Sequence, residues 1–138
     1  MPVLGIELHK HESHVAVLPD ESRDEEPLEE VRVRNANLEE IAAKYEGSKA
    51  VIEATSRYYT VYERLSEHLE VAVANPLELS WIADSSQKTD EIDAQKLAEL
   101  HRADIVPESY VPSEEIRPLR ALTRGRGAVV YERKEWNN

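Results

Sequence analysis

The sequence predicts a mixed α/β sheet with helices on both faces. Two features of the chain support this fold class. The first third contains three short segments in which apolar residues form blocks or alternate with polar ones, as in strands. After them, segments with a period near 3.6 alternate with further short apolar runs. Three successive strands followed by helix and strand in alternation indicate a sheet that starts antiparallel and is then covered on both faces.

The three opening strands are expected at residues 3–9, 14–18 and 30–34. The first two form a hairpin, and the acidic segment 19–27 is a solvated loop. In the third strand, valines alternate strictly with charged residues, so we expect one of its faces to be exposed.

Helices and strands alternate in the rest of the chain. Asn37 is a suitable N-cap with Glu40 as its capping-box partner, and Gly47 suits the end of that helix. The elements that follow are a strand at 49–54, a helix from Ser56 with an apolar stripe to Leu69, a strand at 71–74, a short helix around 77–83 and a helix at 88–101. Pro107 and Pro112 bracket an extended link, and a last helical stretch starts at Ser113.

The charge balance restricts the partners of this chain. A net charge of −11, from 28 acids and 17 bases, argues against a general nucleic-acid binder, because phosphate contacts need Lys and Arg. The segment 113–138 is the exception, with six bases and four acids. It is the only plausible phosphate-facing surface, although a solvated helix face or a coiled-coil flank explains its spacing equally well. The candidate nucleic-acid-binding residues are Arg117, Arg120, Arg124 and Arg126.

The composition also indicates the cellular compartment of the protein. The chain has no cysteine, which excludes disulfides and thiolate zinc sites. No apolar run approaches the roughly 20 residues of a membrane span, and no signal-peptide pattern opens the chain. We therefore expect a cytoplasmic protein without membrane contact. The acidic excess would also suit a protein that works at high salt.

The helix expected at 88–101 carries acids where a core-facing helix is normally apolar. At about 100° per residue, Asp90 and Asp93 fall within its apolar stripe. Burial of two carboxylates is costly unless each is paired, hydrogen-bonded or bound to a cation. The spacing therefore suggests a metal site. The stripe consists of Ala94, Leu97, Ala98, Leu100 and His101.

Two further acids interrupt apolar strands. Glu7 lies between Ile6 and Leu8, and Glu53 follows Val51 and Ile52. If the first and fourth strands are neighbours, these two acids converge, and the helix with Asp90 and Asp93 can reach the same place. Four oxygen donors without cysteine suit Mg²⁺ or Mn²⁺, and two such ions about 4 Å apart can promote phosphodiester cleavage.

Each acid also has a simpler interpretation. Asp90 could cap its helix, Glu7 could face water on an edge strand, and Glu53 could pair with Arg57. All four acids being structural is less plausible than a shared site. Three histidines lie near the first hairpin, and we interpret them as solvated turn residues rather than ligands, with His9 on the face of Glu7. These are His9, His11 and His14.

Four motifs in order resemble the N-terminal domain of DEDD transposases, insertion-sequence recombinases with a RuvC-like, ribonuclease-H-type catalytic domain. They are Gly5-Ile6-Glu7-Leu8-His9-Lys10, Ile52-Glu53-Ala54-Thr55, Ala74-Asn75-Pro76 and Lys88-Thr89-Asp90-Glu91-Ile92-Asp93-Ala94. The resemblance extends from Val3 into the last helix. It implies a ribonuclease-H-like (RuvC-like) domain at 1–106, with 107–138 as a linker and the start of a helical segment leading to a further domain.

The resemblance implies that Glu7, Glu53, Asp90 and Asp93 are the catalytic and metal-binding acids. It also implies DNA strand cleavage and exchange, dependence on Mg²⁺ (or Mn²⁺) with two ions, a homo-oligomer, and a guide called bridge RNA. Two departures stand out. The family has Asp where this chain has Glu7, whose extra methylene would move the carboxylate by more than about 1 Å. The family also continues into a domain with a serine nucleophile, whereas this sequence stops at Asn138.

The sequence thus predicts a metal-dependent DNA transposase domain. The alternative is a degenerate or truncated transposase fragment that keeps a nucleic-acid-binding or oligomerisation role without catalysis. Half of an actin-like ATPase, which shares the sheet topology, is disfavoured because no glycine-rich phosphate loop is recognisable.

Overall fold

A computed structural model describes residues 1–20, 26–55, 58–82 and 90–112 of this chain. Five strands in the described residues form one sheet, in the order β3-β2-β1-β4-β5. β2 is antiparallel to β1 and to β3, whereas β4 is parallel to β1 and to β5. The strands are β1 (Val3–Leu8), β2 (Glu12–Leu18), β3 (Glu29–Arg34), β4 (Lys49–Glu53) and β5 (Glu70–Ala74).

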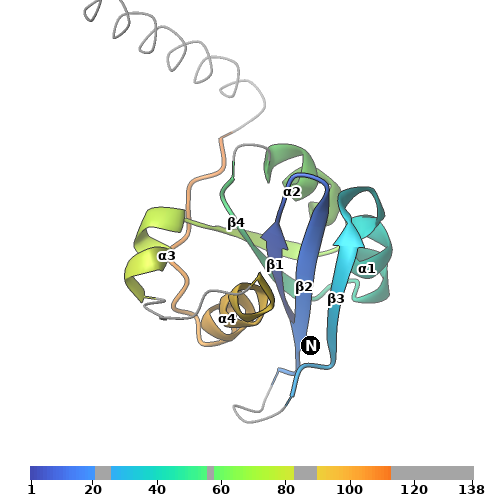
Figure 1. The fold of residues 1–138 in the computed structure, drawn as a ribbon, viewed down its shortest axis with the longest axis horizontal. Helices are drawn as coiled ribbons and strands as arrows, with labels where there is room; N and C mark the ends of the chain where they lie inside the picture. The colour runs from blue at the N-terminus through green and yellow to red at the C-terminus, as the bar shows by residue number, and fades with distance from the viewer. Residues whose placement is uncertain (21–25, 56–57, 83–89, 113–138) are drawn as a thin grey trace, which may run out of the picture.

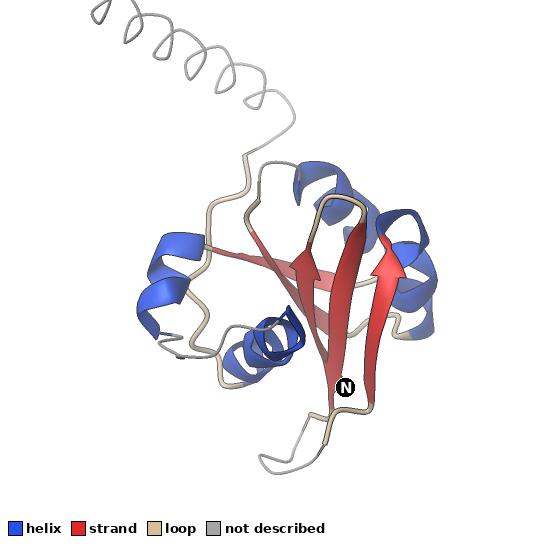
Figure 2. Ribbon diagram, viewed as in Figure 1, coloured by secondary structure: helices blue, strands red, loops and turns tan. Residues whose placement is uncertain are grey.

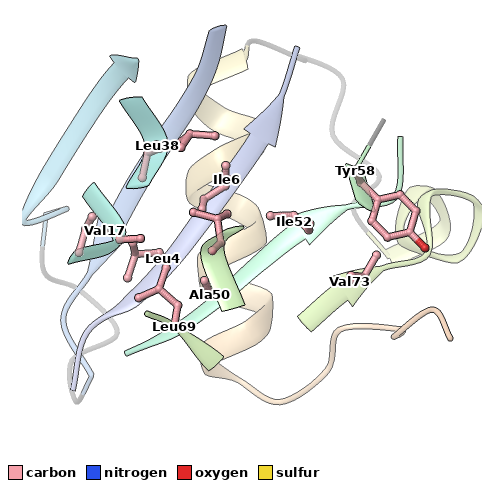
Figure 3. Close-up of a cluster of buried hydrophobic side chains, with 12 residues drawn as sticks. Leu4, Ile6, Val17, Leu38, Ala50, Ile52, Tyr58, Leu69 and Val73 are labelled. Atoms are coloured by element: carbon pink, nitrogen blue, oxygen red, sulfur yellow. The ribbon is translucent and has the colours of Figure 1, made fainter. Parts of the chain in front are cut away.

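Helices cover both faces of this sheet, as Figures 1 and 2 show. On one face lie α1 (Leu38–Lys44) and α2 (Tyr58–Ser66), and on the other lie α3 (Pro76–Ile82) and α4 (Asp90–Arg102). The larger core fills the space between the sheet and the first pair (Figure 3), where Leu4, Ile6 and Ile52 pack against Leu38 and Tyr58. The predicted mixed sheet, with its antiparallel start and two covered faces, is confirmed.

Strand β1 separates the two faces by simple alternation. Leu4 and Ile6 point to the large core, so Gly5 and Glu7 point to α4. A Cβ built on Gly5 would lie 1.9 Å from the carbonyl oxygen of Ala94 and 2.7 Å from the amide nitrogen of Ala98. The backbone of α4 therefore rests directly on β1, and the absent side chain of Gly5 makes this approach possible.

The carboxyl end of α4 is closed by a Schellman motif. Asp104 adopts a left-handed conformation with φ of 58°. Its amide donates to the carbonyl of His101 at 3.0 Å, and the amide of Ile105 donates to Leu100 at 3.1 Å. This motif fixes where α4 ends, and so where its other residues lie on the sheet.

We expect Asp104→Gly to raise the free energy of unfolding by about 0.5 kcal/mol, because glycine adopts the left-handed conformation without steric cost. Asp104→Ala should lower it by a similar amount. Urea denaturation of both variants measures their free energies of unfolding. Equal free energies for Asp104→Gly and Asp104→Ala would contradict the motif.

The structure corrects one local expectation, at Asn37, and confirms another, at Gly47. Asn37 does not cap α1 through its side chain, because a 3₁₀ turn over Asn35–Asn37 precedes the helix and gives Asn37 a nearly helical ψ of 4°. Gly47 adopts the expected positive φ, at 80°. Residues 107–109 run beside β5, where Ser109 donates to the carbonyl of Val73 at 2.7 Å. The domain boundary at 106 stays a prediction, and the helix expected from Ser113 lies outside the described residues.

None of the helices in the described ranges has the length and apolar character needed to cross a bilayer.

Candidate active site at the carboxyl ends of β1 and β4

Glu7 and Glu53 lie side by side on the sheet. The parallel pairing of β1 and β4 puts Ile6 opposite Ile52, so the next residue of each strand is an acid. Each acid lies two residues after a residue that faces α4, namely Gly5 on β1 and Val51 on β4, and therefore lies on the same face of the sheet. The expected convergence of Glu7 and Glu53 therefore follows from the register that the structure shows.

Glu7 lies on the central strand of the sheet and is only 9% exposed. The interpretation of Glu7 as a water-facing residue on an edge strand is therefore wrong, because β1 is flanked by β2 and β4. A carboxylate in such a place needs compensation by a cation or by hydrogen-bond donors. Within the described residues, the Nε2 atom of His9 lies 3.6 Å from its Oε1 atom.

The first turn of α4 lies close to this pair of acids. Ala98 packs with Val3 at the start of β1, and Ala94 lies over Gly5. The helix therefore runs opposite to β1, and its first turn, which holds Asp90 and Asp93, extends past Gly5 toward Glu7. The side chains of Asp90 and Asp93 lie outside the described residues. Their role as ligands stays a prediction.

Histidines border the acids on the side of β2. His14 is the antiparallel register partner of Glu7 and is only 2% exposed. Its ring meets that of His9 edge to face, with the centroids 5.5 Å apart. The interpretation of His14 as a solvated turn residue is therefore wrong: it belongs to β2, between the sheet and α4. The predicted placement of His9 on the face of Glu7 is confirmed.

The sequence around His14 already indicates that this residue is buried. His14 is the third residue of β2, and Ala16 and Leu18, two and four residues on, share its face and are buried. Alternation alone would have placed His14 inside. A small pocket of about 130 Å³ lies beside it, lined by Ala94 of α4 and Arg32 of β3 among others.

The donor set fits a hard divalent cation. Glu7 and Glu53 supply carboxylate oxygens at one end of the sheet, and the chain has no cysteine to favour a softer metal. Among the described side chains, no group of three or more acids and histidines is arranged to hold an ion. The side chains of Asp90 and Asp93, the other two predicted ligands, are not among the described ones. The candidate nucleic-acid-binding residues of the C-terminal segment lie outside the described residues: Arg117, Arg120, Arg124 and Arg126.

Comparison with known families identifies the class of this chain. A family model of IS110-type DEDD transposases, described as "Transposase", matches residues 4–138. The chain belongs to this family, as its motifs indicated. The comparison with curated proteins finds no match to the sequence.

Solved structures agree on the fold. The RuvC structure of Thermus thermophilus is 11% identical to this chain, with a TM-score of 0.51, over 79% of this chain and 100% of the RuvC chain. The T. thermophilus RuvC in complex with its Holliday junction substrate gives a TM-score of 0.50 at the same identity and the same coverage. At this identity the comparison shows the fold, which is RuvC-like and thus ribonuclease-H-like.

Proposed function

We propose that this domain cuts a DNA strand during transposition by metal-dependent phosphodiester cleavage. The observation that carries the proposal is the pair Glu7 and Glu53. Each follows directly on the register pair of Ile6 and Ile52, near the carboxyl ends of β1 and β4 and on the side of the start of α4. Membership of a transposase family supports the reaction class. A RuvC of the same fold is described in complex with a Holliday junction, which supports DNA as the partner.

In this proposal, Glu7, Glu53, Asp90 and Asp93 hold two Mg²⁺ or Mn²⁺ ions. When bound, such ions activate the attacking hydroxyl or water and stabilise the leaving oxygen. His9 orients the Glu7 carboxylate from 3.6 Å away. The backbone contact between Gly5 and Ala94 sets the distance between the strand acids and the helix acids.

The wider assembly is proposed from family membership alone. We infer a catalytic domain at 1–106, a linker from 107, a homo-oligomer and a bridge RNA that pairs with donor and target DNA. Arg117, Arg120, Arg124 and Arg126 are proposed to contact nucleic acid from the C-terminal segment.

Metal binding to this site is expected to stabilise the fold. At a Mn²⁺ concentration about a hundredfold above Kd, one site adds about 2.7 kcal/mol to the free energy of unfolding. Differential scanning fluorimetry with and without Mn²⁺ should show the shift for the wild type and not for Glu53→Gln. The matched control is Glu70→Gln, an exposed acid at the opposite end of the neighbouring strand, which should keep the shift. A melting temperature that Mn²⁺ leaves unchanged would count against an intact site.

The second candidate function is a degenerate transposase domain that retains the fold without catalysis. The longer Glu7 side chain, where the family has Asp, favours it. A nuclease assay on branched and single-stranded DNA separates the two candidates. Metal-dependent cleavage that Asp93→Asn abolishes supports the enzyme, and DNA binding without cleavage supports the degenerate domain.

A further inference from the structure

A second pocket lies immediately beyond the two acids. It has a volume of about 590 Å³, within the roughly 300–1,000 Å³ that ligand pockets usually have. Its wall is built from the β1–β2 turn, from the residues after β4 and from α2. We call it the turn pocket, and the residues that matter for its chemistry are Leu8, His9, Lys10, Thr55, Thr60 and Arg64.

His9 joins the turn pocket to the acid pair. It lines the pocket and also lies 3.6 Å from Glu7. Leu8 and Thr55 lie one and two residues beyond Glu7 and Glu53, respectively. A ligand that extends from the acids along this end of the sheet would therefore enter the pocket next.

The lining of the turn pocket differs in charge from the rest of the chain. Of the 138 residues 28 are acids, yet no acid is among the described residues that line this pocket. Its polar groups are instead Lys10, Arg64, the ring of His9, the amide of Asn35 and two threonine hydroxyls. Asn35 already donates its amide to the carbonyl of His9 at 2.8 Å. Lys10 and the threonine hydroxyls are donors that suit an anion such as a phosphodiester. Leu8 and Val61 add apolar surface against which a sugar can pack.

The two bases have different tasks. Arg64 is already engaged, because it donates to Glu39 at 2.9 Å and to the carbonyls of Asn35 and Ala36. The hydrogen bond to the Glu39 carboxylate holds the pKa of Arg64 above its ordinary value. The bonds to the two carbonyls connect α2 to the turn that precedes α1. Lys10 is exposed and makes no ion pair with a carboxylate in the described part of the chain. Lys10 is therefore the cation available to a ligand.

We propose that the turn pocket binds the phosphodiester next to the one that is cut, with Lys10 and the Thr60 hydroxyl as its donors. The inference rests on the proposed function and adds the path of the DNA strand: from the acid pair, past His9, toward α2. It also explains how a chain with a net charge of −11 can approach DNA, since no acid is among the described residues that line this pocket.

The test measures binding of the full chain to a labelled single-stranded DNA oligonucleotide by fluorescence anisotropy in EDTA, where no cleavage occurs. Lys10→Gln should weaken binding about threefold to tenfold and reduce the salt slope by about 0.7, because one phosphate contact is lost. Thr60→Val should also weaken binding, without changing the salt slope. Lys49→Gln is the matched control: it removes the same charge from an exposed residue at the opposite end of β4 and should bind like the wild type.

Two results would overturn the inference: wild-type affinity in Lys10→Gln, or an equal loss in Lys10→Gln and Lys49→Gln. The Mn²⁺-induced melting shift is read in the same variants. Suppose that Mn²⁺ raises the melting temperature of the wild type and not of Glu53→Gln, while Lys10→Gln binds DNA like the wild type. The turn pocket is then refuted as a DNA site, and the metal site stands. If the wild type neither binds DNA nor responds to Mn²⁺, the proposed function fails as well.

Discussion

Gly5→Ala is expected to lower the free energy of unfolding by about 3 kcal/mol or more, a loss of roughly 10 °C in melting temperature for a domain of this size. The added Cβ would lie 1.9 Å from the carbonyl oxygen of Ala94, which is backbone and cannot move to another rotamer. The helix would have to shift away from β1. Because α4 carries Asp90 and Asp93, the shift would also weaken Mn²⁺ binding in whatever fraction remains folded.

Gly47→Ala is the matched control. Gly47 has a positive φ of 80°, but its added Cβ would meet only the flexible end of Met1, at 3.1 Å. We expect a cost of about 1 kcal/mol from backbone strain, with Mn²⁺ binding unchanged. Thermal denaturation of both variants measures the difference in stability between them. A Gly5→Ala protein as stable as Gly47→Ala would show that α4 does not lie on β1 as described.

Removal of a single predicted metal ligand is expected to have the largest effect on activity. Glu53→Gln and Asp93→Asn should each reduce metal-dependent DNA cleavage by at least about a hundredfold, since a misplacement of about 1 Å already has that effect. Neither variant should lose stability without metal, because neutralising one acid relieves repulsion within a group of like charges. Single-turnover cleavage of a branched DNA substrate, together with melting in EDTA, measures both quantities.

Glu12→Gln controls for the loss of negative charge near the site. Glu12 is an exposed acid at the start of β2, opposite Arg34 of β3. It should retain cleavage within about twofold of the wild type. Cleavage by Glu53→Gln and Asp93→Asn at the level of Glu12→Gln would contradict the assignment of these acids.

Periodicity was sufficient to predict most of the fold. A largely apolar block indicated β1 and a period of two indicated β3. The apolar stripe Ala94, Leu97, Ala98 and Leu100 is buried as expected. The parallel register of β1 and β4 required tertiary information, because nothing local states which strands become neighbours. The role of Gly5 also required tertiary information, because it depends on the contact between β1 and α4.

The sequence predicted those parts of the candidate site in which a charged residue lies within an apolar segment. Glu7 was singled out as an acid inside an apolar strand, and it is buried on the central strand. His14 was misjudged because its nearness to a turn outweighed its alternation with Ala16 and Leu18. The turn pocket was not foreseen, because Lys10, Thr60 and Arg64 come from separate elements that only folding brings together.

The central claim is that Glu7, Glu53, Asp90 and Asp93 form one divalent-metal site. Crystals of the chain soaked in Mn²⁺ and measured for anomalous scattering test it most directly. We predict one or two anomalous peaks at the carboxyl ends of β1 and β4, with carboxylate oxygens of Glu7 and Glu53 and of at least one α4 acid about 2.1 Å away. An occupied manganese site elsewhere with none at this position, or these acids paired with protein cations in its place, would contradict the claim.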